Sequence, residues 1–394
     1  MAVYLDYNAT TPVDPDVQDT IIETLKNEWG NPSSSYSLGT HAKEAIEDAR
    51  FQVANMIWAS PGNIVFTSGG TESNMMVIQT VIKRFYEEKI NAPNYTESLP
   101  HIITSNIEHD SIKLPLEELK NQEKIDVTFV PVSKVTGAIE VDDILNQVKP
   151  STCLITLMLA NNETGVIQPI NLLKDKLSAL KRKNSHTIYL HTDAAQAIGK
   201  LPVDISELDV DYLTIVGHKF YGPRIGALYF KTNSPLYPIF YGGGQEKSYR
   251  PGTENTCMIA GLGRAAELVS KNLNEYIHTM SSMKEYLEKR LKETFKEKVI
   301  FNCKSICPML PNTLSVAFNY NVNGKALLAT SGICASTGAA CHSSQKSSPI
   351  LIASGVPANL ASKTLRLSVG RETTKEDIDV AVKKLRDAIN SLSK

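Results

Sequence analysis

Two short apolar segments, each followed closely by a reactive side chain, constrain the fold of this chain most. The segment Thr187–His191 runs into HTDAAQ, which places Asp193 just after it. The segment Tyr212–Val216 runs into GHKFYGP, which places Lys219 just after it. Continuous apolar runs of this length are typical of strands that helices cover on both faces. The sequence therefore predicts two buried strands with a carboxylate and an amine at their carboxyl ends.

The alternation of apolar runs and helical patterns extends from about residue 40 to about residue 250. The remaining strand-like runs are Ile64–Thr67, Ile102–Ser105, Val127–Val130, Cys153–Leu159 and Gly226–Tyr229. Helical patterns lie at about 40–58, 71–88, 111–122, 171–184 and 257–297. This order predicts an α/β fold built on a mostly parallel seven-stranded sheet.

The pattern changes after about residue 255, where a long helix rich in leucine, methionine and charge begins. A last helix is predicted to start at Thr374, because Thr374 and Asp377 have the spacing of a capping box. We predict a large domain over residues 15–260. Residues 1–14 and 261–394 are predicted to form a smaller α+β domain.

Polar residues follow several of the predicted strands at the point where each strand ends. Gly70 and Thr71 follow the first strand, His109 the second and Asn162 the fourth. In parallel α/β sheets, ligands bind beyond the carboxyl ends of the strands. These residues, together with the carboxylate and the amine, predict one binding site at one edge of the sheet.

A lysine and an aspartate at neighbouring strand ends suit pyridoxal phosphate (PLP). The amine of Lys219 can hold the cofactor aldehyde as a Schiff base, and Asp193 can keep the pyridine nitrogen protonated. The glycines before Thr71 and the helix that follows suit a phosphate group. Either motif alone is more often a surface lysine or a turn aspartate. In this order, with Gln196 and His218 beside them, they predict a PLP site.

Two further residues stand out near the end of the chain. Cys341 lies in STGAACHSS, a loop of small residues that suits a nucleophile which must move, although an exposed thiol without a function is the plain alternative. Arg366 lies in a strand-like segment, TLRLSVGR, and is a natural clamp for a carboxylate.

Two other motifs do not predict a site. GLGRAAE at 261–267 follows no strand, so we predict no dinucleotide site there. Cys303 and Cys307 lack a second ligand pair, so no metal site is predicted.

The bulk composition argues against several classes of partner. The net charge of -1 and the pI of about 6.7 give no electrostatic signature for nucleic acid or for an anionic membrane. The longest apolar run, Cys153–Ala160, is far shorter than the ~20 residues of a membrane helix. The chain has 6 scattered cysteines and no recognisable leader. We expect a soluble, cytosolic protein.

The motifs together resemble the class V aminotransferase group of fold-type-I PLP enzymes, and in particular the cysteine desulfurases. The motifs that carry the resemblance are LDYNATTP, NPSS, TSGGTESN, EHDS, NNETG, HTDAAQ, GHKFYGP, GGGQE, RPGTEN, GAACHS and LRLSVGR, in the order of that family. Within the family, LTIVGHKFYGPRIGALY and PVSKVTGAIEVDDIL are most similar to the branch that acts on selenocysteine.

The resemblance implies a role for each candidate site residue. Lys219 would carry the cofactor, Asp193 would pair with the pyridine nitrogen, and Gln196 would bind the phenolic oxygen. His109 would stack on the ring and act as an acid or base, and the phosphate would be held by Gly70, Thr71 and His218, with Thr253 reaching it from the other subunit. The substrate carboxylate would be held by Arg366, Asn162 and Asn8, and Cys341 would accept the chalcogen. One departure is Val216, because many members carry a serine there that contacts the phosphate.

The resemblance implies a homodimeric lyase that converts L-selenocysteine to L-alanine through a perselenide on Cys341, which a reductant or an acceptor protein then discharges. The alternative is a cysteine desulfurase that forms a persulfide on Cys341 for iron–sulfur clusters or tRNA thiolation. Choosing selenium over sulfur is a difference of rates, and no feature of the sequence locates its cause. A scaffold without catalysis predicts a broken set of residues, and ordinary aminotransfer has no need of Cys341.

Overall fold

The main sheet carries the elements that position the site. The computed structural model describes residues 3–90, 98–173, 175–177, 187–303, 307–338 and 347–393. The sheet has seven strands in the order β1-β7-β6-β5-β4-β2-β3. These are β1 (Ile64–Thr67), β2 (His101–Ser105), β3 (Asp126–Val130), β4 (Thr152–Met158), β5 (Tyr189–Asp193), β6 (Tyr212–Val216) and β7 (Gly226–Phe230). Only β7 runs antiparallel to its neighbours within this sheet, which confirms the predicted mostly parallel α/β fold.

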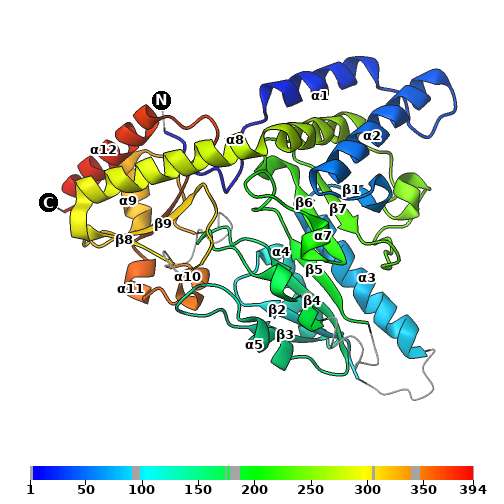
Figure 1. Ribbon diagram of the computed structural model, residues 1–394, viewed down its shortest axis with the longest axis horizontal. Helices are drawn as coiled ribbons and strands as arrows, with labels where there is room; N and C mark the ends of the chain where they lie inside the picture. Colours follow the sequence, from blue (N-terminus) through cyan, green and yellow to red (C-terminus); the bar gives the residue numbers. More distant parts are fainter. Residues whose placement is uncertain are drawn as a thin grey trace.

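Different helices cover the two faces of this sheet (Figure 1). α3 (Gly70–Ile90) and α4 (Asp110–Asn121) pack in one hydrophobic core. α2 (Ser37–Met56) and the first half of α8 (Thr256–Phe295) pack in the core on the opposite face. Shorter elements around the sheet are α1 (Pro15–Asn27), α5 (Val141–Asn146) and α7 (Ile205–Leu208). Burial on both faces explains why several of the strands read as continuous apolar runs, whereas β3 at the edge of the sheet is only partly buried.

A second, smaller sheet lies beside the far half of α8 (Figure 1). It is antiparallel in the order β10-β9-β8, and its strands are β8 (Val299–Phe301), β9 (Thr313–Phe318) and β10 (Thr364–Ser368). Its helices are α9 (Gly324–Ser331), α10 (Pro349–Ala353), α11 (Ala358–Ala361) and α12 (Lys375–Leu392). Thr374 caps α12 in a complete capping box with Asp377, as the sequence predicts. The residue boundaries of the two predicted domains stay a prediction.

The N-terminal segment belongs to this second unit by its contacts. Val3 and Leu5 are buried in the same core as β9, β10 and α12. Asp6 forms a β-bridge with Ser368 at the end of β10. The chain therefore passes the second sheet before it enters α1, and the residues just after this bridge are brought next to the carboxyl ends of the main strands.

The sequence predicts the seven strands of the main sheet closely and the helices less completely, and it does not predict β8 and β9 of the second sheet. β1 and β6 have the predicted bounds, and β5 begins two residues later than predicted, so that Asp193 is its last residue. α1 was not predicted from the sequence. The helix predicted at 171–184 lies mostly outside the described residues. Within the described ranges, no helix is long and apolar enough to cross a membrane.

The GLG segment near the start of α8 allows close packing against two other helices. A Cβ at Gly261 would lie 2.6 Å from Ile21 Cγ1 of α1, and one at Gly263 would lie 2.5 Å from Ala49 Cα of α2. Both glycines lie inside the helix, as the sequence indicates. They let α8 lie directly against α1 and α2, which leaves no loop at this point that could hold a dinucleotide.

We predict that Gly263→Ala destabilises the protein. Helix propensity alone would make alanine more favourable by about 1 kcal/mol, whereas the clash with the Ala49 backbone is expected to cost about 1–3 kcal/mol. Thermal or urea unfolding measures the net sign. Asn274→Ala, at an exposed position of the same helix, is the matched control and is expected to change stability by less than about 0.5 kcal/mol. A more stable Gly263→Ala protein would contradict the packing interpretation.

Candidate active site

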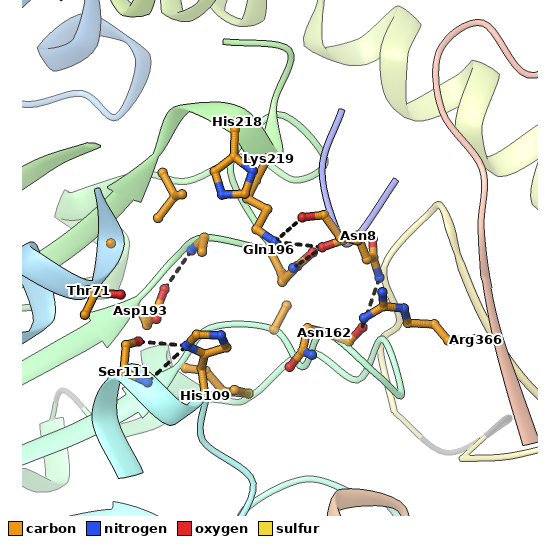
Figure 2. A pocket seen from close by; sticks show the side chains of 16 residues that line it. Asn8, Thr71, His109, Ser111, Asn162, Asp193, Gln196, His218, Lys219 and Arg366 are labelled. Carbon is orange, nitrogen blue, oxygen red and sulfur yellow. Dashed lines mark hydrogen bonds between the residues drawn. The ribbon is translucent and has the colours of Figure 1, made fainter. Parts of the chain in front are cut away.

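A cavity of about 280 Å³ opens at the carboxyl ends of the main strands (Figure 2). The predicted site residues that line it are Asn8, Gly70, Thr71, His109, Asn162, Asp193, Gln196, His218, Lys219 and Arg366. Five strand ends of the main sheet, the N-terminal segment and β10 contribute to this set. Thr253 is exposed and is not part of the lining, and Cys341 lies outside the described residues.

The amine and the carboxylate face the cavity from neighbouring strands and bond to their own surroundings. Lys219 ends a 3₁₀ turn that follows β6 directly, and its Nζ donates to the backbone carbonyls of Asn8 and Ala9 at 2.9 and 2.7 Å. Asp193 Oδ1 accepts from the backbone N–H of Ala195 at 3.0 Å, and Oδ2 accepts from Asn74 Nδ2 at 3.0 Å. Figure 2 shows the two groups on separate sides of the cavity. The space between them suits a ring that contacts both.

A second lysine behind the cavity was not predicted from the sequence. Lys200 is buried, and its Nζ donates to Gln196 Oε1 at 2.8 Å and to Asn8 Oδ1 at 3.3 Å. Burial, reinforced by the charges of Lys219 and Arg366, lowers the pKa of Lys200 well below its ordinary value. The amine therefore fixes the Gln196 side chain, whose Nε2 donates to the Asn8 carbonyl at 3.0 Å. The sequence signal is a lysine in AAQAIGKL, a segment in which Gln196 is the only other polar side chain.

One end of the cavity suits a phosphate. Gly70 and Thr71 begin α3, a 21-residue helix whose N-terminal N–H groups favour an anion. A Cβ at Gly70 would lie 2.6 Å from Val216 Cγ2, so only glycine lets the helix start this close to β6. Burial and the charges of Lys219 and other nearby cations lower the pKa of His218 to about 4. His218 is therefore neutral at pH 7, with Nδ1 3.1 Å from Thr10 Oγ1.

The other end of the cavity holds polar atoms without a partner among the described residues. Arg366 is 3% exposed and donates from Nη2 to Asp6 Oδ1 at 2.6 Å and from Nη1 to the Asn162 carbonyl at 3.0 Å. Its Nε and the Oδ1 atom of Asn162 are buried without a hydrogen bond. Buried polar atoms are normally paired. An N–H donor beside a carbonyl acceptor fits the carboxylate and the ammonium group of an amino acid.

The donor set fits PLP. The helix start suits the phosphate, Asp193 suits the ring nitrogen, Lys219 suits the aldehyde, and Gln196 suits a ring oxygen. Further cavity walls come from Ala9, Ser111, Met158, Ala160, Ala195 and Val216. Among the residues that the structure describes, no group of three or more His, Cys, Asp or Glu side chains is placed to hold a metal ion.

Comparison with known proteins finds relatives that match nearly the whole length of the chain. The family model named Aminotransferase class-V matches residues 3–380. A selenocysteine lyase from Bos taurus is 49% identical over 411 residues, which cover 99% of this chain and 94% of that protein. The cysteine desulfurase IscS from Dictyoglomus turgidum is 38% identical over 395 residues, covering 99% and 95%. A solved structure of a NifS-like protein matches with a TM-score of 0.87 at 33% identity, covering 99% and 100%.

A buried carboxyl beneath the cavity makes stability depend on pH. Glu108 precedes His109 and accepts hydrogen bonds from Ser105 Oγ and from the backbone N–H of Met158. Burial raises the pKa of Glu108 from 4.5 to about 8. Between these two values the unfolded chain is ionised and the folded chain keeps the proton. The free energy of unfolding therefore falls as pH rises through this window.

We predict that Glu108→Gln removes this dependence. The stability of the variant relative to the wild type is expected to rise by about 1.4 kcal/mol per pH unit between about pH 5 and pH 8, because the amide cannot ionise. Urea unfolding at three pH values measures the trend. Glu118→Gln, at an exposed position of α4, is the control and is expected to leave the wild-type slope unchanged. Parallel pH profiles for Glu108→Gln and the wild type would show that Glu108 is already ionised in the folded protein.

Proposed function

The chain belongs to the class-V aminotransferase family, and from that premise we propose that it is a PLP-dependent selenocysteine lyase. It converts L-selenocysteine to L-alanine and releases selenium. The observation that carries the proposal is identity of about half to a selenocysteine lyase over nearly the whole chain, combined with the amine and carboxylate that face one cavity. Cysteine desulfurase is the second candidate, which the 38% identity to IscS favours.

The cofactor would be held by residues from four strand ends. Lys219 would bind its aldehyde, Asp193 its ring nitrogen and Gln196 its phenolic oxygen. Gly70, Thr71 and His218 would hold the phosphate, and the ring of His109 would stack on the pyridine. When bound, PLP supplies an electron sink that stabilises negative charge at the substrate α-carbon.

The proposed work of the protein at the α-carbon is proton transfer. The amine of Lys219 is held by the carbonyls of Asn8 and Ala9, and once released from the cofactor it would take the α-proton. Asp193, fixed by two hydrogen bonds, would keep the ring nitrogen protonated throughout. Lys219 would thus move the α-proton, whereas Asp193 would hold the proton on the ring nitrogen.

The substrate would be oriented by the opposite end of the cavity. Arg366 Nε is the donor left for a substrate carboxylate, and Asn162 Oδ1 is the acceptor beside it. The amide nitrogen of Asn8 already donates to Asn162 and Thr313, so we propose that Asn8 supports this clamp from behind.

Cys341 would accept the selenium. Its thiolate sulfur would form a bond to selenium while the bond between selenium and Cβ breaks, and the electron pair of that bond would stay with the carbon. Protonation of that carbon, together with return of a proton from Lys219 to the α-carbon, gives alanine. A thiol reductant would then release the selenium from Cys341 as selenide, or an acceptor protein would take the selenium atom onto its own thiol and leave the Cys341 thiol free.

We also propose a homodimer in which Thr253 of one copy reaches the phosphate of the other. Thr253 is exposed and does not line the cavity of its own chain. Large exposed apolar side chains gather between residues 22 and 58, and they are Ile22, Leu25, Trp29, Tyr36, Leu38, Phe51 and Trp58. Such a concentration is typical of an interface. The scattered cysteines suit a reducing compartment, and we propose the cytosol.

We predict that the purified protein is yellow with PLP and releases alanine from selenocysteine at least about tenfold faster than from cysteine at equal concentration, which corresponds to about 1.4 kcal/mol. Lys219→Ala is expected to lose both the colour and the activity. Cys341→Ser is expected to keep the colour and lose selenium release. Comparable rates on both amino acids would favour the desulfurase, and full activity of Cys341→Ser would favour aminotransfer. A colourless wild type would point to a scaffold without catalysis.

We predict that Arg366→Lys raises KM for the amino acid more than it lowers kcat. Lysine keeps the charge and loses the planar set of donors that match a carboxylate, so an increase in KM of about tenfold or more is expected. Arg386→Lys, at an exposed position of α12, is the matched control and should leave both constants unchanged. An unaltered KM in Arg366→Lys would remove Arg366 from the substrate site.

A further inference from the structure

The hydrogen bonds around the ring of His109 determine which of its nitrogens carries the proton. His109 caps α4, and the backbone N–H of Ser111 donates to Nδ1 at 3.1 Å. The hydroxyl of Ser111 lies 2.8 Å from the same atom. A backbone amide only donates, so Nδ1 must hold a lone pair rather than a proton. The ring is therefore neutral and carries its proton on Nε2.

Asn74 orients the hydroxyl of Ser111. Its side chain is fully buried, and Nδ2 donates to Ser111 Oγ at 2.9 Å and to Asp193 Oδ2 at 3.0 Å. Because the Ser111 oxygen accepts from Asn74, its own proton points to Nδ1 of His109. Two donors therefore converge on Nδ1, and Figure 2 shows this edge of the ring turned toward Ser111.

The chain of hydrogen bonds continues behind Asn74 with the same direction. Thr214 Oγ1 donates to Asn74 Oδ1 at 2.7 Å, and His191 Nε2 lies 3.0 Å from Thr214 Oγ1. Burial lowers the pKa of His191 to about 4, so His191 is neutral and its single proton lies on Nε2, toward Thr214. Reversing one bond in this chain would set two donors or two acceptors against each other. The buried network thus holds Asn74 and Ser111 in one orientation.

The other ionisable groups of the described cavity lining are already engaged. Lys219 donates to two carbonyls, and Asp193 accepts two hydrogen bonds. The pKa of His218 is lowered to about 4 by burial and nearby cations, and its Nδ1 bonds to Thr10. Arg366 is a donor only. A proton brought by the substrate side chain therefore meets, at His109, an N–H group rather than a lone pair.

We propose that Ser111 and Asn74 are specificity-determining residues, because they hold His109 as the tautomer that offers a donor, and no acceptor, to the substrate side chain. The inference rests on the proposed function and deepens it. A selenol is a stronger acid than a thiol and is ionised at neutral pH, so selenocysteine needs no acceptor and its selenolate accepts the Nε2 proton as a hydrogen bond. Cysteine is mostly a thiol at neutral pH and brings a proton that the site does not take up.

The tautomer can be measured without turnover. The full-length protein is labelled with ¹⁵N-histidine, and the signal of His109 among the 8 histidines is assigned by its absence in His109→Gln. Nitrogen shifts of the PLP-loaded protein and of the protein without cofactor are expected to show protonation at Nε2 alone at neutral pH. A proton on Nδ1, or on both nitrogens, in the wild type would overturn the inference.

The selectivity is tested by Ser111→Ala, with Ser111→Thr as the matched control. Alanine removes the hydroxyl donor and keeps the backbone N–H, so the ratio of kcat/KM for selenocysteine to that for cysteine is expected to fall about fivefold, which is the weight of one hydrogen bond. The fall should come from faster use of cysteine. Ser111→Thr keeps a hydroxyl and is expected to restore most of the ratio. An unchanged ratio in Ser111→Ala would overturn the inference.

The two proposals fail in different ways. A wild type that prefers selenocysteine, with an unchanged ratio in Ser111→Ala, keeps the proposed function and removes this inference. A wild type that uses both amino acids equally removes both the selenium preference and the inference. A wild type that uses neither removes the proposed function, and the nitrogen shifts measured on the same protein then decide the tautomer by themselves.

Discussion

One buried asparagine joins the two sheets at the cavity, and the rest of the site depends on it. The carbonyl of Asn8 accepts from Lys219 Nζ and from Gln196 Nε2, both carried by the main sheet. Its amide nitrogen donates to Thr313 of β9, and its backbone N–H donates to Ser368 of β10. Asn8 itself is 1% exposed, so none of these bonds competes with bulk water. The position of the amine relative to the second sheet is therefore set by a residue eight positions from the start of the chain.

Burial lowers the pKa values of several basic groups around the cavity. The pKa of Lys200 is lowered well below its ordinary value, and the pKa values of His191 and His218 are lowered to about 4, in each case first by burial. At pH 7 the two histidines are therefore neutral, and all three groups act as hydrogen-bonding partners that orient their neighbours. The amine of Lys219 and the guanidinium of Arg366 line the same cavity, which suits a ligand with a phosphate at one end and a carboxylate at the other.

The strands and the main cavity residues were predictable because their signals are local. A largely apolar run marks most strands of the main sheet, and Asp193 and Lys219 are recognisable because each follows such a run. The roles of Asn74 and Ser111 were not predictable, since they depend on contacts between α3, α4, β5 and β6 that exist only in the folded chain. The role of Lys200 depends in the same way on its contact with Asn8. α1 was missed because few of its side chains are buried. The roles of Thr253 and Cys341 stay predictions.

The 40-residue helix α8 limits the size of the substrate, because it fixes the distance between the two sheets. At 1.5 Å per residue it is a rod of about 60 Å, with Leu262 packed in the first core and Leu287 in the second. Gly261 and Gly263 let α8 pack directly against α1 and α2. Moving the two sheets apart would therefore require bending a helix whose backbone hydrogen bonds are continuous. The distance between the amine of Lys219 and the guanidinium of Arg366 is therefore held constant. A bulkier substrate side chain must therefore extend toward the mouth of the cavity, because the two ends of the cavity are fixed in position.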